Sequence, residues 1–311
     1  MTDRDQMVPD YLAVGDLGVD SIAMLDHLPR ADEKLWVEPV GDFPGGMMGN
    51  AAVVVAALGI SAGVVALIGS DERGTLVLDA LRERGVETGT VRRIDAPSFW
   101  TLSLTVPSGD RTLIQFPTPA FGADWDFDRG ILPGCRWVHT IAEQGEAVVP
   151  LLRDARAAGA TTSIDIEFPF VLRIDLPAIL PHVDVAFMNT GAAEALGGVD
   201  EATRFAKEHG ARTVLVTLGA EGAFLQDRAG HTRHIPAIEV EPVDTNGAGD
   251  AFAGAFAAGV LKGFDEIEAA ELAVFMAGRS TTALGGFGPD VSIDDLRELA
   301  RSGGFGWWER L

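Results

Sequence analysis

Short apolar runs alternate with helical patterns along most of this 311-residue chain, and no other feature constrains its fold as strongly. The runs typical of strands are Tyr11–Val14, Val64–Ile68, Trp137–Thr140, Ser163–Ile166, Val185–Met188 and Val214–Thr217. The helical patterns between them cover Thr75–Arg84, Ala147–Ala158 and Glu201–Glu208. Strands that alternate with helices pair in parallel and have helices on both faces, so we predict an α/β fold with a doubly wound, mainly parallel sheet.

Three strand-like segments lie outside this alternation. Phe99–Val106 and Thr112–Phe116 are typical of a β-hairpin around the turn residues Pro107–Asp110. Lys34–Val40 is a further strand-like piece. We expect these segments to form a small β-sheet lid that projects from the α/β body.

The domain organisation follows from these segments. We expect a single domain over residues 11–311, preceded by a polar tail over residues 1–10. The lid is expected to come from about residues 17–42 and 96–118, inserted in the α/β body.

Composition limits the partners and the compartment. With 46 acidic and 24 basic residues, the net charge is −22, so a basic face for nucleic acid is not expected, and a nucleotide would need a cation such as Mg²⁺ to approach. Cys135 is the single cysteine and permits no internal disulfide, which suits a reducing compartment. The first ten residues lack a signal-peptide pattern, so we expect a cytoplasmic protein.

Ala51–Ile68 is an 18-residue stretch with almost no polar residue, which is long enough to suggest a membrane span. Gly59 and Gly63 interrupt it, however, and its valines fall in two short groups. We therefore interpret it as a buried helix over Gly49–Leu58, a turn, and a buried strand, with no association with a membrane.

A glycine-rich turn, Asp244-Thr245-Asn246-Gly247-Ala248-Gly249-Asp250, opens a helix of small apolar residues. The N-terminus of a helix offers unpaired N–H groups and a positive dipole end, and Gly247 and Gly249 let a ligand approach closely, so the turn predicts an anion site. A carboxylate at Asp250 would repel a resting phosphate. We interpret Asp250 as a base that deprotonates a hydroxyl beside the phosphoryl group. The alternative is an acid that only stabilises the start of the helix.

Other polar groups follow the predicted strands, at the carboxyl ends where open parallel sheets bind ligands. They are Asp16 and Asp20 after the first strand, Gly45-Gly46 and Asn50 before a helix, Asn189 and Glu194 after Val185–Met188, and Thr217, Gly219 and Gly222 after Val214–Thr217. For each group a solvated turn or a helix cap remains the alternative.

Taken in order, three motifs resemble the ribokinase-like sugar kinases of the PfkB family. These are Gly45-Gly46-x-x-x-Asn50, Val216-Thr217-Leu218-Gly219-x-x-Gly222 and the turn Asp244–Asp250. The resemblance covers about Tyr11 to Leu299. It implies ATP-dependent phosphorylation of a sugar or related alcohol, on a Rossmann-like body with a β-sheet lid.

The resemblance also implies a role for each motif residue. Asp250 is the expected catalytic base, and Gly247, Ala248 and Gly249 line the expected anion hole. The residues expected to face the sugar are Asp16, Asp20, Gly45, Gly46, Asn50 and Arg111. Those expected on the nucleotide side are Asn189, Thr217, Gly219, Gly222 and Thr245. A monovalent cation such as K⁺ is expected near Asp244, Ala283 and Gly285.

Two departures from the family pattern bear on the metal and the substrate. Many members carry Asn-x-x-Glu to order Mg²⁺ through water, but Asn189 is followed at the third position by Ala192. Either Glu194 substitutes for that acid from a shifted turn, or metal binding is arranged differently. Met47 stands where ribokinases usually have a lysine, which disfavours ribose.

The segment Arg111–Pro119 looks like that of relatives acting on ketohexoses or their sulfonated analogues. A ketohexose or a related sugar is therefore the expected substrate. A sulfonate would need a cationic partner, for which Arg111, Arg30 and Lys34 are candidates.

Two alternatives stay open. A nucleoside kinase of the same family would need an apolar or aromatic base pocket, which Trp36, Phe99 and Trp100 could supply, although packing within the lid is the favoured explanation of these residues. A non-catalytic sensor would have lost Asp250 or the turn glycines, and this chain keeps them. No P-loop or dinucleotide-binding fingerprint is present. Because a small sheet with exposed edges is a liability, we also expect a homodimer formed through the lid.

Overall fold

Eight strands form the central sheet of the computed structural model, which describes residues 8–37, 39–106 and 111–311. The strand order is β14-β13-β12-β11-β10-β9-β1-β4. Neighbouring strands from β4 to β12 pair in parallel, and β13 and β14 are antiparallel to their neighbours. The bounds are β1 (Tyr11–Val14), β4 (Ala62–Val65), β9 (Trp137–Ile141), β10 (Thr161–Ile166), β11 (Val185–Asn189), β12 (Thr213–Thr217), β13 (Ala223–Gln226) and β14 (Thr232–Ile235).

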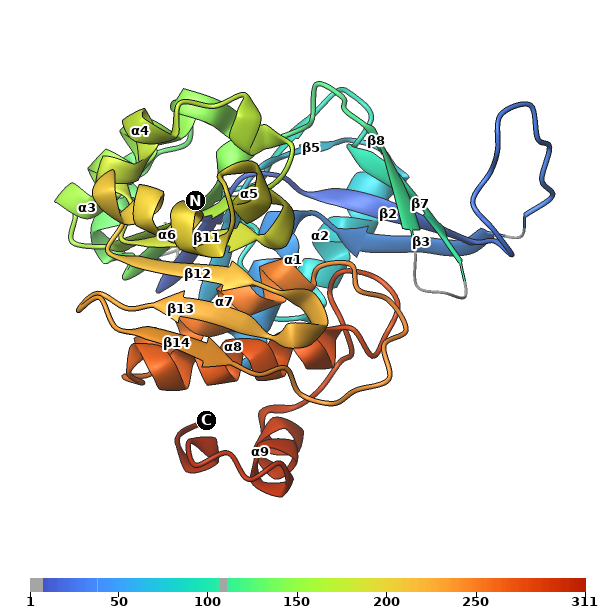
Figure 1. Cartoon of the computed structure of the whole chain (residues 1–311). Helices are drawn as coiled ribbons and strands as arrows, with labels where there is room; N and C mark the ends of the chain where they lie inside the picture. Colours follow the sequence, from blue (N-terminus) through green and yellow to red (C-terminus); the bar gives the residue numbers. More distant parts are fainter. Residues whose placement is uncertain (1–7, 38, 107–110) are drawn as a thin grey trace.

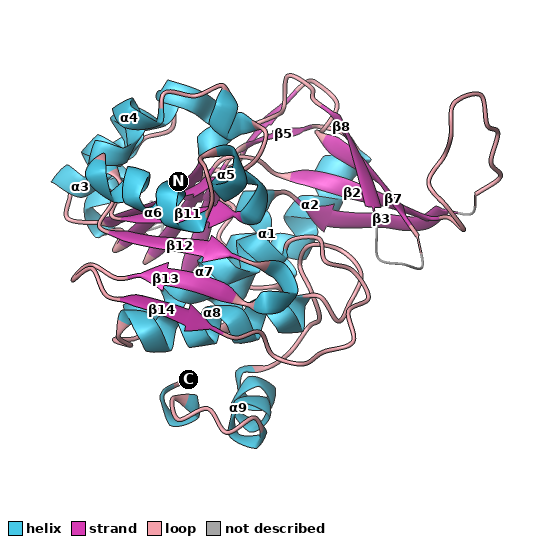
Figure 2. Cartoon of the chain, viewed as in Figure 1, coloured by secondary structure: helices cyan, strands magenta, loops and turns pink. Residues whose placement is uncertain are grey.

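Helices cover both faces of this sheet (Figure 1 and Figure 2). One face carries α1 (Met47–Ala57), α7 (Ala248–Leu261) and α8 (Glu266–Ser280), and the other carries α3 (Val148–Ala157), α4 (Leu176–Ile179), α5 (Thr190–Ala195) and α6 (Val199–Glu208). Helix α2 (Glu72–Glu83) lies beside the lid, and α9 (Ile293–Ser302) ends near the C-terminus. Short 3-10 segments occupy Arg129–Gly134, Ala142–Ala147, Phe170–Leu172, Leu180–His182, Gly219–Glu221 and Trp308–Arg310.

The two-residue period of the strands explains why each face has its own core. In β11, Phe187 points to one face and meets Phe256 of α7 edge to face, with the ring centroids 5.7 Å apart. Its neighbours Ala186 and Met188 belong to the core on the opposite face. Helix α7 is apolar almost all round because it is buried among α1, α8 and the sheet.

A second, four-stranded sheet projects from the body as the lid (Figure 2). Its order is β3-β2-β7-β8, with β2 and β7 parallel and the other pairs antiparallel. The bounds are β2 (Gly18–Met24), β3 (Pro39–Gly45), β7 (Trp100–Thr105) and β8 (Arg111–Phe116). A separate parallel pair, β5 (Leu67–Gly69) and β6 (Arg92–Ile94), lies next to it along the chain.

The fold class predicted from the sequence is confirmed, and so is the pairing of the two hairpin strands. The predicted turn Pro107–Asp110 and most of the predicted tail lie outside the described residues.

Two local predictions about strands were wrong. The strand expected over Lys34–Val40 begins only at Pro39 and continues to Gly45, because pairing with β2 selects the later segment. The single strand expected over Val64–Ile68 is divided, since β4 pairs with β1 while β5 pairs with β6.

The long apolar stretch Ala51–Ile68 divides into α1, β4 and β5, as its glycines indicated. Within the described part of the chain, no helix combines the length and the apolar character that a membrane crossing requires.

We predict that Gly254→Ala destabilises the fold. A Cβ at Gly254 would lie 2.5 Å from the carbonyl oxygen of Ala51, so α1 and α7 would have to separate. We expect a loss of about 1–3 kcal/mol in the free energy of unfolding, measured by urea titration. The matched control is Gly249→Ala in the same helix, where nothing lies within 4 Å of the added Cβ. Equal stability of the two variants would contradict the close packing of these helices.

Candidate active site

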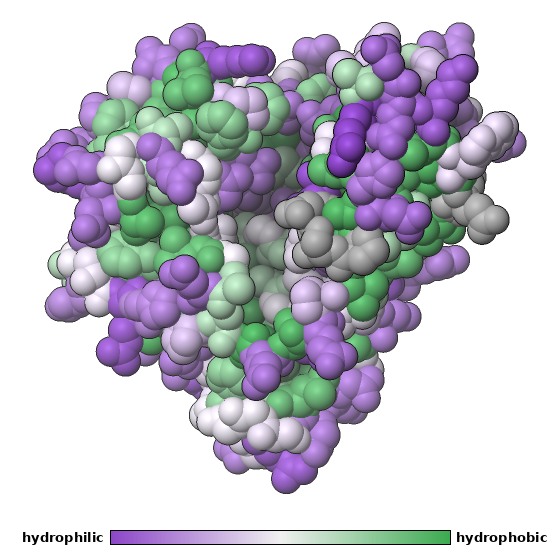
Figure 3. Space-filling view, turned by 45° about the vertical axis from the view of Figure 1, so that its right-hand side comes forward, coloured by the Kyte–Doolittle hydropathy of each residue, from purple (hydrophilic) through white to green (hydrophobic). Residues whose placement is uncertain are grey.

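Two cavities meet at the start of α7. The smaller, of about 180 Å³, lies between the body and the lid, where Figure 3 shows a hollow in the surface. The larger, of about 500 Å³, lies beside β12 and α8. Thr245, Ala248 and Gly249 line both cavities, so a molecule held in one would meet a molecule held in the other at this turn.

The turn has a backbone conformation that demands glycine. Gly247 precedes α7 with a φ of 73°, and a Cβ there would lie 2.7 Å from the carbonyl oxygen of Gly286. At Gly249, by contrast, an added Cβ would meet open space. The unpaired N–H groups of the first turn of α7 are therefore accessible where the two cavities meet, which suits an anion.

Asp250 lies in the first turn of α7 and lines the smaller cavity. Its side chain is buried, and Asn50 Nδ2 donates a hydrogen bond of 2.7 Å to Oδ2. Burial raises the pKa of Asp250 well above its usual value, the charge of Glu167 raises it further, and the bond from Asn50 opposes both effects. A buried carboxylate with a raised pKa is suited to accept a proton from a hydroxyl.

Two more carboxylates line the smaller cavity beside the lid. Asp16 accepts the N–H of Met47 through Oδ2 at 3.3 Å, whereas its buried Oδ1 has no hydrogen-bond partner among the described residues. Burial raises the pKa of Asp16 to about 6. Asp20 accepts Asn246 Nδ2 at 3.0 Å, and burial, followed by the charge of Asp244, raises its pKa to about 7. Both side chains are placed to accept hydrogen bonds from ligand hydroxyls.

The glycine pair positions these acids against α1. Gly46 has a φ of 92°, and a Cβ there would lie 2.6 Å from the Cα of Leu17. A Cβ at Gly45 would lie 2.6 Å from Asp20 Oδ2. Glycine is therefore required at both positions. It allows β3 to end beside β2, and it allows α1 to start at a point from which Asn50 reaches Asp250.

Arg111 extends from β8 to the glycine-rich turn. Its Nη1 donates to Thr245 Oγ1 at 2.7 Å and lies 3.7 Å from Asp244 Oδ1. Arg111 thus connects the lid to the junction of the two cavities, in addition to the bond between Asp20 and Asn246.

The larger cavity is mostly apolar. Its walls include Phe252, Val274, Ile238 and Val240, with Thr217, Gly219 and Gly222 at its edge. Gly222 has a φ of 96°, and a Cβ there would lie 2.0 Å from the carbonyl oxygen of Ile235. A slot of this size and character suits a flat aromatic group such as a nucleotide base.

The structure brings most of the predicted site residues to these cavities. Asp16, Asp20, Gly46, Asn50, Arg111, Thr245, Gly247, Ala248, Gly249 and Asp250 line the smaller cavity, and Thr217, Gly219 and Gly222 line the larger one. The predicted residues that line neither are Gly45, Asn189, Glu194, Asp244, Ala283 and Gly285.

These six have other positions. Asp244 accepts the N–H of Gly285 at 3.0 Å and that of Asn246 at 2.9 Å, so it ties the turn to the loop that contains Ala283. Asn189 caps α5 by accepting the N–H of Ala192 at 2.8 Å. Glu194 is exposed on α5.

The sequence reasoning missed Glu167. This residue follows β10 and lines the smaller cavity, and Asn189 Nδ2 lies 3.5 Å from its Oε1. Burial and the charge of Asp16 raise the pKa of Glu167. Its position directly after the predicted strand Ser163–Ile166 was the available signal, because acids at the carboxyl ends of parallel strands gather at one edge. Asn246, within the turn motif, was also missed and contacts Asp20.

Residues 9–289 match the family described as pfkB family carbohydrate kinase. The chain belongs to this family. It is therefore a kinase, a phosphotransferase with an alcohol group as acceptor, of the group that acts on sugars and nucleosides.

Individual relatives agree with the family assignment. The chain is 29% identical to an ATP-dependent ribose-1-phosphate kinase of Halopiger xanaduensis, over 84% of this chain and 88% of that kinase. It is 27% identical to the ribokinase of Bacillus subtilis, over 92% and 97% of the two chains. Among solved structures, the ribokinase of Thermotoga maritima is 25% identical and superposes with a TM-score of 0.79, over 94% of this kinase and 99% of that chain.

We predict that Asp16→Asn removes part of the pH dependence of stability. Because burial raises the folded-state pKa of Asp16 to about 6, the stability that its protonated form gives is complete below about pH 4 and is lost as the pH rises through 6. Asparagine stays neutral. The variant should therefore gain about 1–3 kcal/mol over the wild type between pH 4 and pH 8, measured by urea unfolding.

The exposed Asp95 offers the matched control. Asp95→Asn should follow the wild type at both pH values. An Asp16→Asn variant that also follows the wild type would show that Asp16 is not a buried carboxylate of raised pKa.

Proposed function

We propose that this kinase transfers the γ-phosphoryl group of ATP to a hydroxyl of an uncharged sugar, with Asp250 as the base. The observation that carries the proposal is the junction of the two cavities at Thr245, Ala248 and Gly249, with Asp250 beside it in the smaller one. The larger, apolar cavity takes the adenine side of ATP and the smaller, polar one takes the sugar. Support for ATP comes from the relative described as an ATP-dependent ribose-1-phosphate kinase.

The reaction needs positioning and charge stabilisation more than covalent help. Asp250 takes the proton of the attacking hydroxyl while the N–H groups of Gly247, Ala248 and Gly249 hold the oxygens of the phosphoryl group. Asn50 fixes the orientation of the Asp250 carboxyl through its hydrogen bond. The lid covers the smaller cavity and excludes water, which would otherwise compete with the sugar.

Mg²⁺ fits the acidic side of the junction. Within the described ranges, no three His, Cys, Asp or Glu side chains are placed to hold a metal together, so the ion would be held through water and the ATP phosphates. Glu167 lines the smaller cavity, and so does Asp16, whose Oδ1 has no hydrogen-bond partner among the described residues, so both can accept hydrogen bonds from such waters. Glu167, next to Asn189, is better placed for this role than the exposed Glu194. The ion would neutralise charge on the transferred group.

A monovalent cation is proposed at the loop behind the turn. Asp244 N donates to the carbonyl of Thr281 at 3.1 Å, and the Asp244 carboxylate accepts Gly285 N. These bonds hold two backbone segments side by side near a buried negative charge. K⁺ there would be bound by the groups around Asp244, Ala283 and Gly285, and it would support the geometry of the anion hole.

The charges in the smaller cavity favour a neutral substrate. Among the described residues that line it, four acids (Asp16, Asp20, Glu167 and Asp250) face a single arginine. That arginine, Arg111, is already bonded to Thr245. A ketohexose or a related neutral sugar therefore fits better than its sulfonated analogue, since Arg30 and Lys34 are exposed and line neither cavity.

A nucleoside is the second candidate, because one lid aromatic reaches the smaller cavity. Phe99 lines it and packs on Phe121, with ring centroids 4.6 Å apart. The other two aromatic residues considered for a base pocket lie elsewhere: Trp100 stacks on Phe116 within the lid, and Trp36 is fully exposed.

An ATP-consumption screen tests the proposal. The panel contains ketohexoses, aldoses, sugar acids, sulfosugars, ribose 1-phosphate and nucleosides. We expect the highest kcat/KM with a neutral sugar, because an anionic one must approach four carboxylates. Preference for a sulfosugar or a sugar phosphate would contradict the substrate class but leave the kinase assignment intact.

The same screen includes Asp250→Asn. Loss of the base should reduce kcat by at least about 10²-fold, while ATP binding measured by calorimetry stays within about threefold of the wild type. The matched control is Asp95→Asn, which should keep full turnover. An Asp250→Asn enzyme with near wild-type kcat would refute the role of this residue.

We further propose that the kinase is a homodimer joined through its lids. The outer strand β8 exposes Ile114 and Phe116, and Figure 3 shows apolar residues gathered on the lid. Val40 of β3 and Met24 of β2 are exposed as well. Exposed apolar strands of this kind are usually covered by a partner.

Sedimentation equilibrium should give about twice the 32.8 kDa of one chain at micromolar concentration. Ile114→Lys should reduce the mass to that of one chain, because a charge would be buried in the interface. Leu76→Lys, at an exposed leucine of α2, should leave it unchanged. A wild-type mass near 32.8 kDa would contradict the dimer.

A further inference from the structure

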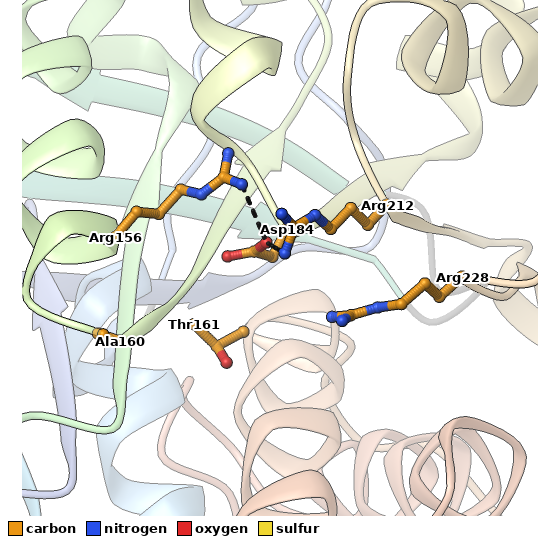
Figure 4. Close-up of a pocket in the computed structure, with 7 residues that line it drawn as sticks. Arg156, Ala160, Thr161, Asp184, Arg212 and Arg228 are labelled. Atoms are coloured by element: carbon orange, nitrogen blue, oxygen red, sulfur yellow. Dashed lines mark ion pairs between the residues drawn. The ribbon is translucent and has the colours of Figure 1, made fainter.

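A third cavity, of about 290 Å³, lies at the other end of the central sheet. Its lining includes Arg156, Arg212 and Arg228, with Asp184, Thr161 and Ala160 (Figure 4). Thr161 begins β10, Asp184 directly precedes β11, and Arg212 directly precedes β12. The catalytic junction lies at the carboxyl ends of the same strands, so this cavity is a separate site.

Asp184 holds two of the three arginines in place. It is buried, and its Oδ2 accepts the N–H of Thr162 at 3.0 Å. Its Oδ1 lies 2.8 Å from Arg212 Nη1 and 3.7 Å from Arg156 Nη2. Arg156 also donates through Nη1 to the carbonyl of Pro181 at 2.7 Å. The two guanidinium groups are therefore oriented before any ligand arrives.

Arg228 supplies a positive charge that forms no ion pair within the part of the chain that the structure describes. Its backbone N–H donates to Glu266, but its guanidinium makes no ion pair or hydrogen bond with any described residue. In Figure 4 this side chain extends across the cavity toward Thr161. Three arginines face one carboxylate here, in a protein whose net charge is −22. Such a local excess of arginine suits a multiply charged oxyanion, because the planar guanidinium group donates paired hydrogen bonds to phosphate oxygens.

We propose that this cavity binds the phosphate group of a small phosphorylated molecule. The guanidinium groups of Arg156, Arg212 and Arg228 donate to the phosphate oxygens, and Thr161 also lines the cavity. At about 290 Å³ the cavity is close to the smallest volumes typical of small-molecule sites, which suits a compact metabolite and not a polymer. The site rests on the arginine cluster and is independent of the proposed catalytic function.

Calorimetry with inorganic phosphate tests the proposal at constant ionic strength, with chloride as the balancing anion. Arg228→Gln should raise the Kd for phosphate about tenfold, because one charge-assisted donor is lost. Arg156→Gln should weaken binding as well. The matched control is Arg153→Gln on the same helix, whose side chain pairs with Asp154 outside the cavity, and it should keep the wild-type Kd.

Phosphate could also bind the anion hole at Gly247–Gly249, and the variants separate the two sites. Arg228 is exposed and bonds to nothing through its side chain among the described residues, so Arg228→Gln should fold normally. A Kd that is equal in the wild type and in Arg228→Gln would mean that phosphate binds elsewhere, and would overturn the proposal. If Arg153→Gln raises the Kd as much as Arg228→Gln does, phosphate responds only to the general charge of the protein. That result would also overturn the proposal.

Discussion

The hydrogen bond from Asn50 to Asp250 joins two residues 200 positions apart, and the geometry of the candidate site depends on it. It links the first turn of α1 to the first turn of α7, and these helices touch further along at Ala51 and Gly254. A buried carboxylate without such a donor would be strongly destabilised. The bond thus explains how Asp250 can be buried. It also requires the two helix starts to lie close together, which the glycines permit.

Negative charge is the dominant electrostatic feature of the candidate site. Glu167, Asp16 and Asp165 all raise the pKa of Asp250, so each carboxylate makes its neighbours better proton acceptors. The same charge repels ATP. In the proposed reaction, a cation and the N–H groups of α7 would hold the phosphates, so a strongly acidic site could still bind an anionic substrate.

The central sheet presents different chemistry at its two ends. At the carboxyl ends of the strands, acids and a helix N-terminus surround the two adjoining cavities. At the opposite end, Arg156, Arg212 and Arg228 gather around Asp184. Strands β10, β11 and β12 run from the arginines to Glu167, Asn189 and Thr217, so a few buried strands separate two regions of opposite charge.

The sequence by itself determined the α/β class, the hairpin of the lid and the turn at Asp244–Asp250, because periodicity and glycine spacing are local properties of the chain. It placed the strand over Lys34–Val40 wrongly, since pairing partners far along the chain set its position. It could place Glu167 at the carboxyl end of a strand but not beside Asp250, and it could not show that Glu194 is exposed. Only the tertiary structure decides which side chains meet, because contacts between distant segments depend on how the helices and strands pack and not on their local pattern.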